Sequence, residues 1–435
     1  MSEYRPIRVA LLGAGSVGAE VARLLLEQKE ELKSRVGAEL ELVGVAVRNL
    51  GTKREGFPKE LLTTDAESLI LGADIVIEVM GGIDPAKDYI LQALNSGADV
   101  VTANKSLLAN HGTELFNLAE QVGAQLYFEA AVAGAIPIIR PLRESLGGDR
   151  VRRIMGIVNG STNYILDRMD KTGISLEDAM AEATKLGYLE ADPSLDVEGF
   201  DAAQKAAILA TLAFHTEVPL EKVHREGITA ITVAQMKAAK RDGFVIKLLA
   251  ICEFLDADSN GPEGISVRVY PALVPRSHPL AAVNGAYNAV FVEAEAAGSL
   301  MFYGSGAGGT QTASAVLGDV VSAAKRHVAG GPGLGNSSHA NLEILPISRI
   351  KTRYSFQLEV SDQPGVLASI ATIFSKHGVS IEAVEQSVLT GDGVVAYLEI
   401  GTHLASEAAL AAVVVDLKAS DAVQKVASVI RMEGL

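Results

Sequence analysis

The sequence has one cysteine, Cys252, and no tryptophan among its 435 residues. A single thiol excludes a disulfide framework within the chain. Cys252 ends the apolar run 247–252, so we expect a buried structural thiol, because a reactive nucleophile needs a polar and partly exposed setting. Aromatic residues make up only 5% of the chain, so smaller aliphatic side chains must fill the interior.

Positive charge and long hydrophobic runs are also scarce. The chain has 38 lysines and arginines and 53 acidic residues, which gives a net charge of −15. This charge argues against non-specific binding to nucleic acid or to anionic membranes. No apolar stretch approaches the roughly 18 residues of a membrane span, and no signal peptide is visible, so we expect a cytoplasmic protein. An anionic cofactor stays possible, because helix N-termini bind phosphate locally.

The chain length and the order of the expected strands and helices predict an α/β enzyme of two or three domains. Strands alternate with helices in the first part, which indicates a Rossmann-type, doubly wound parallel sheet. The expected strands are 7–12, 40–47, 74–79 and 100–102, and the expected helices are 17–28, 65–72 and 84–96. We assign residues 1–135 to a dinucleotide-binding domain, completed by a segment near 304–328.

The remainder predicts an α+β substrate and dimerisation domain, the catalytic domain, over 136–328 and a smaller C-terminal domain over 350–435. In the catalytic domain we expect a strand at 152–158, helices at 175–187, 200–214 and 310–328, and segments of mixed character at 244–256, 265–274 and 287–294. Glycine, proline and serine mark a linker over 329–349. The last domain has the β-α-β-β-α-β order of a ferredoxin-like fold, with strands at 354–360, 381–389, 394–400 and 428–432, helices at 366–377 and 405–417, and a turn at 391–393.

A glycine loop follows the first strand, with the order Gly13, Ala14, Gly15, Ser16, Val17, Gly18. Because this pattern ends a strand and opens a helix, it predicts a site for the pyrophosphate of a nicotinamide dinucleotide. The alternative is a glycine-rich turn without a ligand. The second strand ends without an acid and with Arg48, which favours NADP(H) with NAD(H) tolerated, although Arg48 can equally be a solvated strand-end arginine.

Two lysines are the candidates for catalysis. Lys205 lies one helical turn after Asp201, at the mouth of the apolar helix 206–214. Lys105 follows the strand 100–102 at the carboxyl edge of the sheet, where open α/β folds bind ligands. Together they offer a carbonyl substrate a proton-shuttling group and an orienting cation, whereas each alone can be a structural ion pair. Burial lowers the pKa of such a lysine and neighbouring carboxylates oppose that shift, so its value stays open.

With these motifs the chain resembles homoserine dehydrogenase, in the long form with a C-terminal ACT domain. The resemblance rests on 13–18, 102–105, 129–137, 159–164, 187–205 and 306–308. It implies reversible, NAD(P)H-dependent reduction of L-aspartate 4-semialdehyde to L-homoserine, on the route to threonine, methionine and isoleucine.

The resemblance also implies residue roles. Lys205 would give the proton to the aldehyde oxygen, and Lys105 would lie between cofactor and substrate. The expected substrate contacts are Glu190, Asp201, Asp196, Gly187, Asn159 and Thr162, with Asp196 supporting the lysine. Besides the glycine loop and Arg48, the expected cofactor contacts are Met80, Gly81, Thr102, Asn104, Lys105, Gly187 and Gly306.

A monovalent cation, Na⁺ or K⁺, sits beside the site in this family. Its expected carbonyl ligands here are Glu129, Val132, Gly134 and Ile136, and the alternative is a tight glycine turn beside the core without an ion. Ser161 stands where we expect threonine in relatives, and it keeps the hydroxyl.

The C-terminal domain would hold an effector, threonine by resemblance, on Asp362, Gln363, Gly365, Val366 and Leu367. Backbone amides at a helix start can bind such a small amino acid. The alternative is a structural tail that forms dimers. In either role we expect a homo-oligomer, a dimer or a tetramer.

The sequence leaves three alternative functions. Aspartate-semialdehyde dehydrogenase needs a cysteine nucleophile, and Cys252 is a poor candidate. A reductase of another oxo acid is the nearest alternative. A non-catalytic amino-acid sensor is the third, and the presence of Lys105, Asp201 and Lys205 argues against it.

Overall fold

The computed structural model describes residues 4–52, 58–189, 192–258, 261–331, 338–388 and 395–434. The chain divides into two compact units, each assembled from three stretches of sequence. Unit 1 comprises residues 1–160, 201–223 and 286–342, and unit 2 comprises 161–200, 224–285 and 343–435. Among the described residues, every helix is too short or too polar to span a lipid bilayer.

Unit 1 contains the predicted parallel sheet, with six strands in the order β3-β2-β1-β4-β5-β6. The strands are β1 (Ile7–Leu12), β2 (Leu40–Ala46), β3 (Leu62–Thr63), β4 (Ile75–Glu78), β5 (Asp99–Thr102) and β6 (Leu126–Tyr127). The helices of this part are α1 (Ser16–Glu27), α2 (Lys29–Val36), α3 (Ala66–Leu71), α4 (Ala86–Asn95) and α5 (Lys105–Val122). The prediction of a doubly wound sheet is confirmed, and the charged stretch after α1 forms the separate helix α2.

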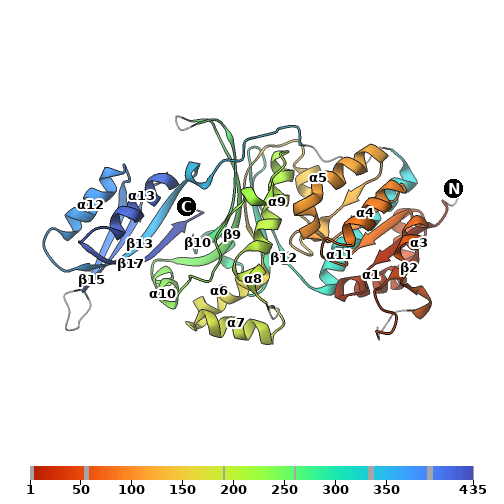
Figure 1. The fold of residues 1–435 in the computed structure, drawn as a ribbon, viewed down its shortest axis with the longest axis horizontal. Helices are drawn as coiled ribbons and strands as arrows, with labels where there is room; N and C mark the ends of the chain where they lie inside the picture. The colour runs from red at the N-terminus through yellow and green to blue at the C-terminus, as the bar shows by residue number, and fades with distance from the viewer. Residues whose placement is uncertain are drawn as a thin grey trace. The chain divides into compact units, whose positions relative to one another are not determined.

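The core of this sheet draws on both ends of unit 1. Strands β1 and β4 are buried along most of their length, and Val21 and Leu25 of α1 pack against them. Helix α11 (Gly309–Ala329) joins the same core through Val316 and Val320, and it contacts α1 (Figure 1). A segment 300 residues away in sequence therefore covers one face of the dinucleotide-binding sheet.

Unit 1 also holds three neighbouring antiparallel strands of a larger sheet and the buried helix α9 (Phe200–Phe214). These strands are β7 (Val151–Ile157), β11 (Tyr287–Ala294) and β12 (Gly298–Ser305), in the order β12-β11-β7. The sequence did not predict β12. Every residue of β12 is exposed or half-buried, so no alternation of apolar and polar residues marks it.

Unit 2 begins with α6 (Gly160–Thr172), α7 (Leu176–Lys185) and α8 (Ser194–Val197), followed by β8 (His224–Arg225) and α10 (Val233–Arg241). The segments predicted to mix helix and strand form a long antiparallel hairpin, β9 (Phe244–Leu255) and β10 (Gly264–Pro275). Both strands are buried on both faces over most of their length. Continuous burial produces a continuous apolar run, and such a run does not distinguish a strand from a buried helix.

The C-terminal part of unit 2 has the predicted ferredoxin-like order. Strands β13 (Lys351–Ser361), β14 (Ile381–Val388), β15 (Val395–Thr402) and β17 (Val423–Met432) lie in the order β17-β13-β15-β14, with the short β16 (Ala405–Ser406) beside β13. Helices α12 (Val366–Lys376) and α13 (Glu407–Lys418) pack together and share one core with the sheet (Figure 1). Strand β17 also pairs in parallel with β10 of the same unit. The predicted turn at 391–393 lies outside the described residues.

Candidate active site

The glycine loop has the geometry of a dinucleotide site. Gly13 has a φ of +105°, and a side chain at Gly18 would place its Cβ 2.1 Å from the carbonyl oxygen of Gly13, so only glycine fits there. A Cβ at Gly15 would meet nothing within 4 Å, which leaves open space in front of α1. In the described structure no side chain caps α1 and no acid lies in its first turn. The amides of Ser16 and Val17 therefore face a site suited to an anion.

A buried carboxylate that was not predicted from the sequence lies beside this loop. Glu78 ends β4 and is fully buried. Its Oε1 accepts hydrogen bonds from the amides of Met80 (2.8 Å) and Gly81 (3.3 Å), and its Oε2 accepts one from the hydroxyl of Thr102 (2.6 Å). Burial raises the pKa of the Glu78 carboxyl, and these hydrogen bonds oppose the rise. An acid at the end of a parallel strand, inside an otherwise apolar run, was the available signal.

The two predicted lysines meet on one carboxylate. Oδ1 of Asp201 lies 2.6 Å from Nζ of Lys105, and Oδ2 lies 2.7 Å from Nζ of Lys205. The side-chain amide of Asn159 donates to the same Oδ2 at 2.9 Å, and Nζ of Lys205 donates to the carbonyl of Val158 at 2.6 Å. The start of α5, the first turns of α9 and the end of β7 thus converge within unit 1.

The burial of these three groups differs in a way that suits a reaction centre. The side chains of Asp201 and Lys205 are 7% and 9% exposed, whereas Lys105 is 41% exposed. Burial alone would raise the pKa of the Asp201 carboxyl, but the ion pairs with Lys205 and Lys105 hold it well below its usual range. Asp201 therefore stays ionised and fixes the ammonium groups in place.

The other expected substrate residues are distributed over both units. Asn159 belongs to the lysine cluster of unit 1. In unit 2, Thr162 is buried in the first turn of α6, Asp196 is half-buried on α8, and Gly187 follows α7 with a φ of +77°. The amide of Gly187 donates to the carbonyl of Thr184, an arrangement typical of a helix end. Glu190 lies outside the described residues.

Two more of the residues expected to contact the cofactor, Asn104 and Arg48, lie in unit 1. Asn104 caps α5, because its Oδ1 accepts from the amide of Leu107 at 3.1 Å. Arg48 is exposed just after β2, and within the described part of the chain it forms no ion pair. The structure gives Ser161, by contrast, a partner in its own unit: its hydroxyl donates to the carbonyl of Tyr188 at 2.6 Å.

The segment predicted to hold a cation is a tight turn. Ala133 and Gly134 both have a φ of +57°, and a Cβ at Gly134 would lie 2.5 Å from the carbonyl of Gly306. The carboxylate of Glu129 points elsewhere: it accepts from the amides of Ile138 (2.6 Å) and Ile139 (2.8 Å). This close approach explains why residue 134 carries no side chain, whereas a Cβ at Gly306 would lie 2.0 Å from the side-chain nitrogen of Asn288.

The C-terminal domain has a cavity where the effector was expected. It has a volume of 360 Å³ and includes all five predicted residues, Asp362, Gln363, Gly365, Val366 and Leu367, in its lining. Gly365 precedes α12 with a φ of +95°, and among the described residues no side chain caps that helix. Gln386 donates to Asp362 across the cavity at 3.2 Å. The cavity therefore combines helix-start amides with polar side chains.

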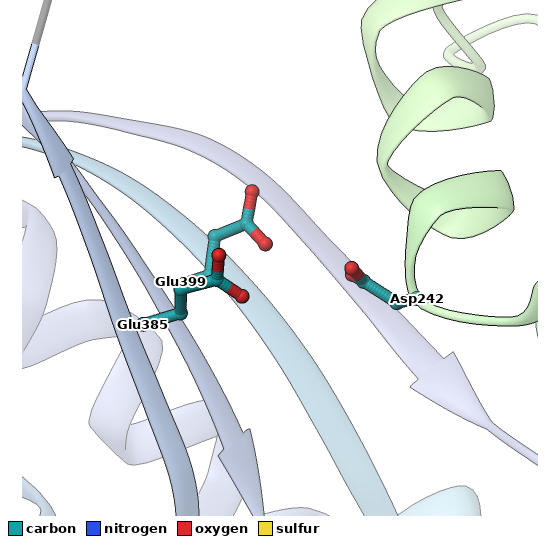
Figure 2. A group of neighbouring side chains, drawn as sticks. All are labelled: Asp242, Glu385 and Glu399. Carbon is teal, nitrogen blue, oxygen red and sulfur yellow. The ribbon is translucent and has the colours of Figure 1, made fainter.

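Two other features are excluded as reaction centres. Cys252 is fully buried, and burial raises the pKa of its thiol to about 12, so the prediction of a structural thiol is confirmed. Figure 2 shows the carboxylates of Asp242, Glu385 and Glu399 close together. One oxygen of each carboxylate lies within 4.8 Å of the other two. Arg241 forms ion pairs with Asp242 and Glu399, and this guanidinium supplies the positive charge that a metal ion would bring.

Comparison with known proteins agrees with this arrangement. Residues 13–129 match the family model "Homoserine dehydrogenase, NAD binding domain", residues 137–321 match "Homoserine dehydrogenase", and residues 354–419 match "ACT domain". The homoserine dehydrogenase of Mycobacterium tuberculosis is 54% identical over 437 residues, with 99% of each chain covered.

Solved structures show the same similarity. The homoserine dehydrogenase of Thiobacillus denitrificans has a TM-score of 0.91 and 39% identity, and 98% of each chain is covered. A hyperthermophilic archaeal homoserine dehydrogenase in complex with NADPH has a TM-score of 0.61 and 30% identity, covering 76% of this chain and 99% of the archaeal one. The chain therefore belongs to the homoserine dehydrogenase family, as an oxidoreductase that uses a nicotinamide cofactor on a CH–OH group and carries a C-terminal ACT domain.

Proposed function

We propose that Lys205 gives the proton to the aldehyde oxygen of L-aspartate 4-semialdehyde, and that Lys105 orients the substrate. The observation that carries this proposal is the Asp201 carboxylate, which holds Nζ of Lys105 at 2.6 Å and Nζ of Lys205 at 2.7 Å. Two ammonium groups held together can polarise one carbonyl oxygen and supply one proton. In homoserine oxidation the same proton returns to Lys205.

The bound nicotinamide cofactor supplies or accepts the hydride. The glycine loop suits its pyrophosphate, because the start of α1 offers amides and open space. The residues expected to contact the rest of the cofactor are Met80, Gly81, Thr102 and Asn104. NADP(H) is the preferred form, because β2 is followed by the exposed cation Arg48.

The test is reduction of NADP⁺ and NAD⁺ by the purified protein with L-homoserine. We expect turnover with both cofactors and a lower KM for NADP⁺. Lys205→Ala removes the ammonium group, and we expect kcat to fall on the order of 100-fold or more. Full activity of Lys205→Ala would contradict the assignment of the proton donor. An equal KM for both cofactors would contradict the role of Arg48.

A monovalent cation, Na⁺ or K⁺, would lie beside the active site on main-chain oxygens of the turn 129–136. Within the described residues, the carbonyls of Val132, Gly134 and Ile136 accept no backbone hydrogen bond, so these oxygens are available as ligands. We expect activity to fall when both ions are replaced by a bulky tetraalkylammonium ion at constant ionic strength. Unchanged activity would reject the cation.

The ACT domain would bind threonine in the 360 Å³ cavity beside α12. The expected response is inhibition by threonine, and Asp362→Ala should weaken it. Asp421→Ala, an exposed acid elsewhere in the same domain, is the matched control and should keep inhibition. Equal inhibition of both variants would reject this cavity as the effector site.

The assembly would be a homo-oligomer in which ACT sheets pair through β14. In the described structure β14 lies at the edge of its sheet, and Val384 on it is 44% exposed. Sedimentation of the intact protein tests this, since a monomer at assay concentration would reject it.

A further inference from the structure

Glu78 lies where three structural features of the dinucleotide-binding sheet meet. It is the last residue of β4, and it pairs with Leu12 of β1 on one side and with Thr102 of β5 on the other. Leu12 immediately precedes the glycine loop, and Thr102 precedes the loop that leads to Lys105. The carboxylate is therefore at the centre of the carboxyl edge, where parallel sheets bind ligands.

One oxygen of this carboxylate shapes the loop after β4. Oε1 accepts from the amides of Met80 and Gly81 at 2.8 and 3.3 Å. The loop in turn forms a wall beside the glycine loop, because a Cβ at Gly13 would lie 3.0 Å from the carbonyl of Val79 and 3.1 Å from Cγ of Met80. A shift of Met80 would therefore change the space beside Gly13.

The other oxygen shapes the loop after β5. Oε2 accepts from the hydroxyl of Thr102 at 2.6 Å, and that hydroxyl oxygen accepts from the amide of Asn104 at 3.0 Å. Asn104 then donates to the carbonyl of Gly82 at 2.6 Å and caps α5. Lys105 begins that helix and reaches Asp201.

We propose that Glu78 is a positioning residue, which holds the loops 79–82 and 102–105 in the arrangement that receives the cofactor and directs Lys105 toward Asp201. The role rests on the proposed function, in which these loops contact the cofactor. Glu78 itself need not touch the substrate, because it acts through the two loops.

The chemistry of the three donors requires a carboxylate. An ionised carboxylate is an acceptor at both oxygens, so it receives two amides and one hydroxyl at once. Glutamine has the same shape but only one acceptor oxygen. If that oxygen kept Met80 and Gly81, its NH₂ group would face Thr102, whose hydroxyl proton would lose its acceptor. Glu78→Gln therefore disturbs the loop after β5 with little change in volume.

The experiment compares Glu78→Gln with Asp99→Asn in the full-length protein. Asp99 is the matched control, because it is also fully buried in this sheet but lies at the opposite end of β5, where it binds Arg326 at 2.7 Å and the amide of Gln125 at 2.8 Å. Measurements are the Kd of NADPH without turnover, kcat, the two KM values and the thermal unfolding midpoint. We expect Glu78→Gln to weaken NADPH binding and lower kcat, each on the order of 10-fold. Asp99→Asn should lower the unfolding midpoint and leave the Kd of NADPH, kcat and the two KM values unchanged.

Two further variants separate positioning from general damage. Thr102→Val removes the hydroxyl that donates to Glu78, so it should reproduce the effect of Glu78→Gln. The double variant Glu78→Gln with Thr102→Val should be little worse than either alone, because both remove the same hydrogen bond. Wild-type kinetics for Glu78→Gln, additive effects in the double variant, or the same loss in Asp99→Asn would each overturn the role.

Failure of the proposed function has a different signature. Ser16→Asp puts a carboxylate at the start of α1, where we propose that the cofactor's phosphates bind, and it should abolish NADPH binding. If Ser16→Asp binds NADPH normally, the proposed cofactor site is wrong. If it loses NADPH while Glu78→Gln binds it normally, the cofactor site stands and the role of Glu78 falls.

Discussion

Replacing Lys205 with methionine tests the proton donor with little change in packing. The variant keeps an unbranched stem of similar length and loses the hydrogen bonds to Val158 (2.6 Å) and Asp201 (2.7 Å). Asp201 keeps its ion pair with Lys105 at 2.6 Å and its hydrogen bond from Asn159 at 2.9 Å. The buried carboxylate therefore stays paired, and we expect the free energy of unfolding to fall by about 1–3 kcal/mol.

The effect on catalysis should be larger than the effect on stability. A positioned acid contributes about 10²- to 10⁴-fold to a rate, so kcat should fall by that factor, equivalent to about 3–5 kcal/mol in the activation barrier. The KM of the cofactor should change little, because Lys205 is not among the residues that we propose to contact it. Steady-state oxidation of L-homoserine and urea unfolding measure the two quantities separately.

Lys171→Met is the matched control for this substitution. Lys171 lies four residues after the largely buried Asp167 on α6 and pairs with it at 2.9 Å, which repeats the spacing of Asp201 and Lys205 on α9. We expect a comparable or smaller loss of stability and an unchanged kcat. A Lys205→Met enzyme with kcat within about threefold of the wild type, or an equal loss of kcat in Lys171→Met, would refute the assignment.

Asp201→Asn leaves two ammonium groups without their shared carboxylate, so stability should fall by about 3–5 kcal/mol in urea unfolding, and kcat should fall with it; a stable, active variant would contradict the bridge. Gly15→Ala should raise the cofactor KM without changing the unfolding midpoint, because its Cβ meets only open space, whereas Gly18→Ala should impair both. Burial lowers the pKa of Lys247 to about 8, below its usual 10.5, so the unfolded chain binds more protons between these values and stability should rise with pH there, by up to about 3 kcal/mol. Lys247→Met should flatten that rise, and an unchanged slope in urea titrations at pH values from about 7 to 10 would refute the shift.

The sequence predicted those features whose signal is local. The glycine loop follows a strand and opens a helix within six residues, so its spacing alone indicates the site. The pair Asp201 and Lys205 was found because four residues make one helical turn, and the apolar run after it predicted burial. The ferredoxin-like order of the C-terminal domain was found because its strands alternate clearly.

Features that depend on distant pairing were not predictable in this way. The proposed role of Glu78 depends on the hydrogen bond that it accepts from Thr102, which lies on the neighbouring strand, 24 residues away in sequence. The bridge between Lys105 and Asp201 joins helices that are separated by almost 80 residues of sequence. Strand β12 lacks a buried face, and the hairpin of β9 and β10 has two, so neither shows the alternation that marks a half-buried strand.

The position of Lys105 is evidence for chemistry rather than for helix stability. It is the first residue of α5, where the helix dipole disfavours a cation, and no acid lies in the first turn of that helix. The compensation comes from α9, whose own first turn carries Asp201 and so favours an anion at that place. The unfavourable charge of Lys105 at the start of α5 is therefore compensated only when α9 brings Asp201 next to it. Because the same aspartate also holds Lys205, this arrangement supports the proposal that the two ammonium groups act on one substrate carbonyl.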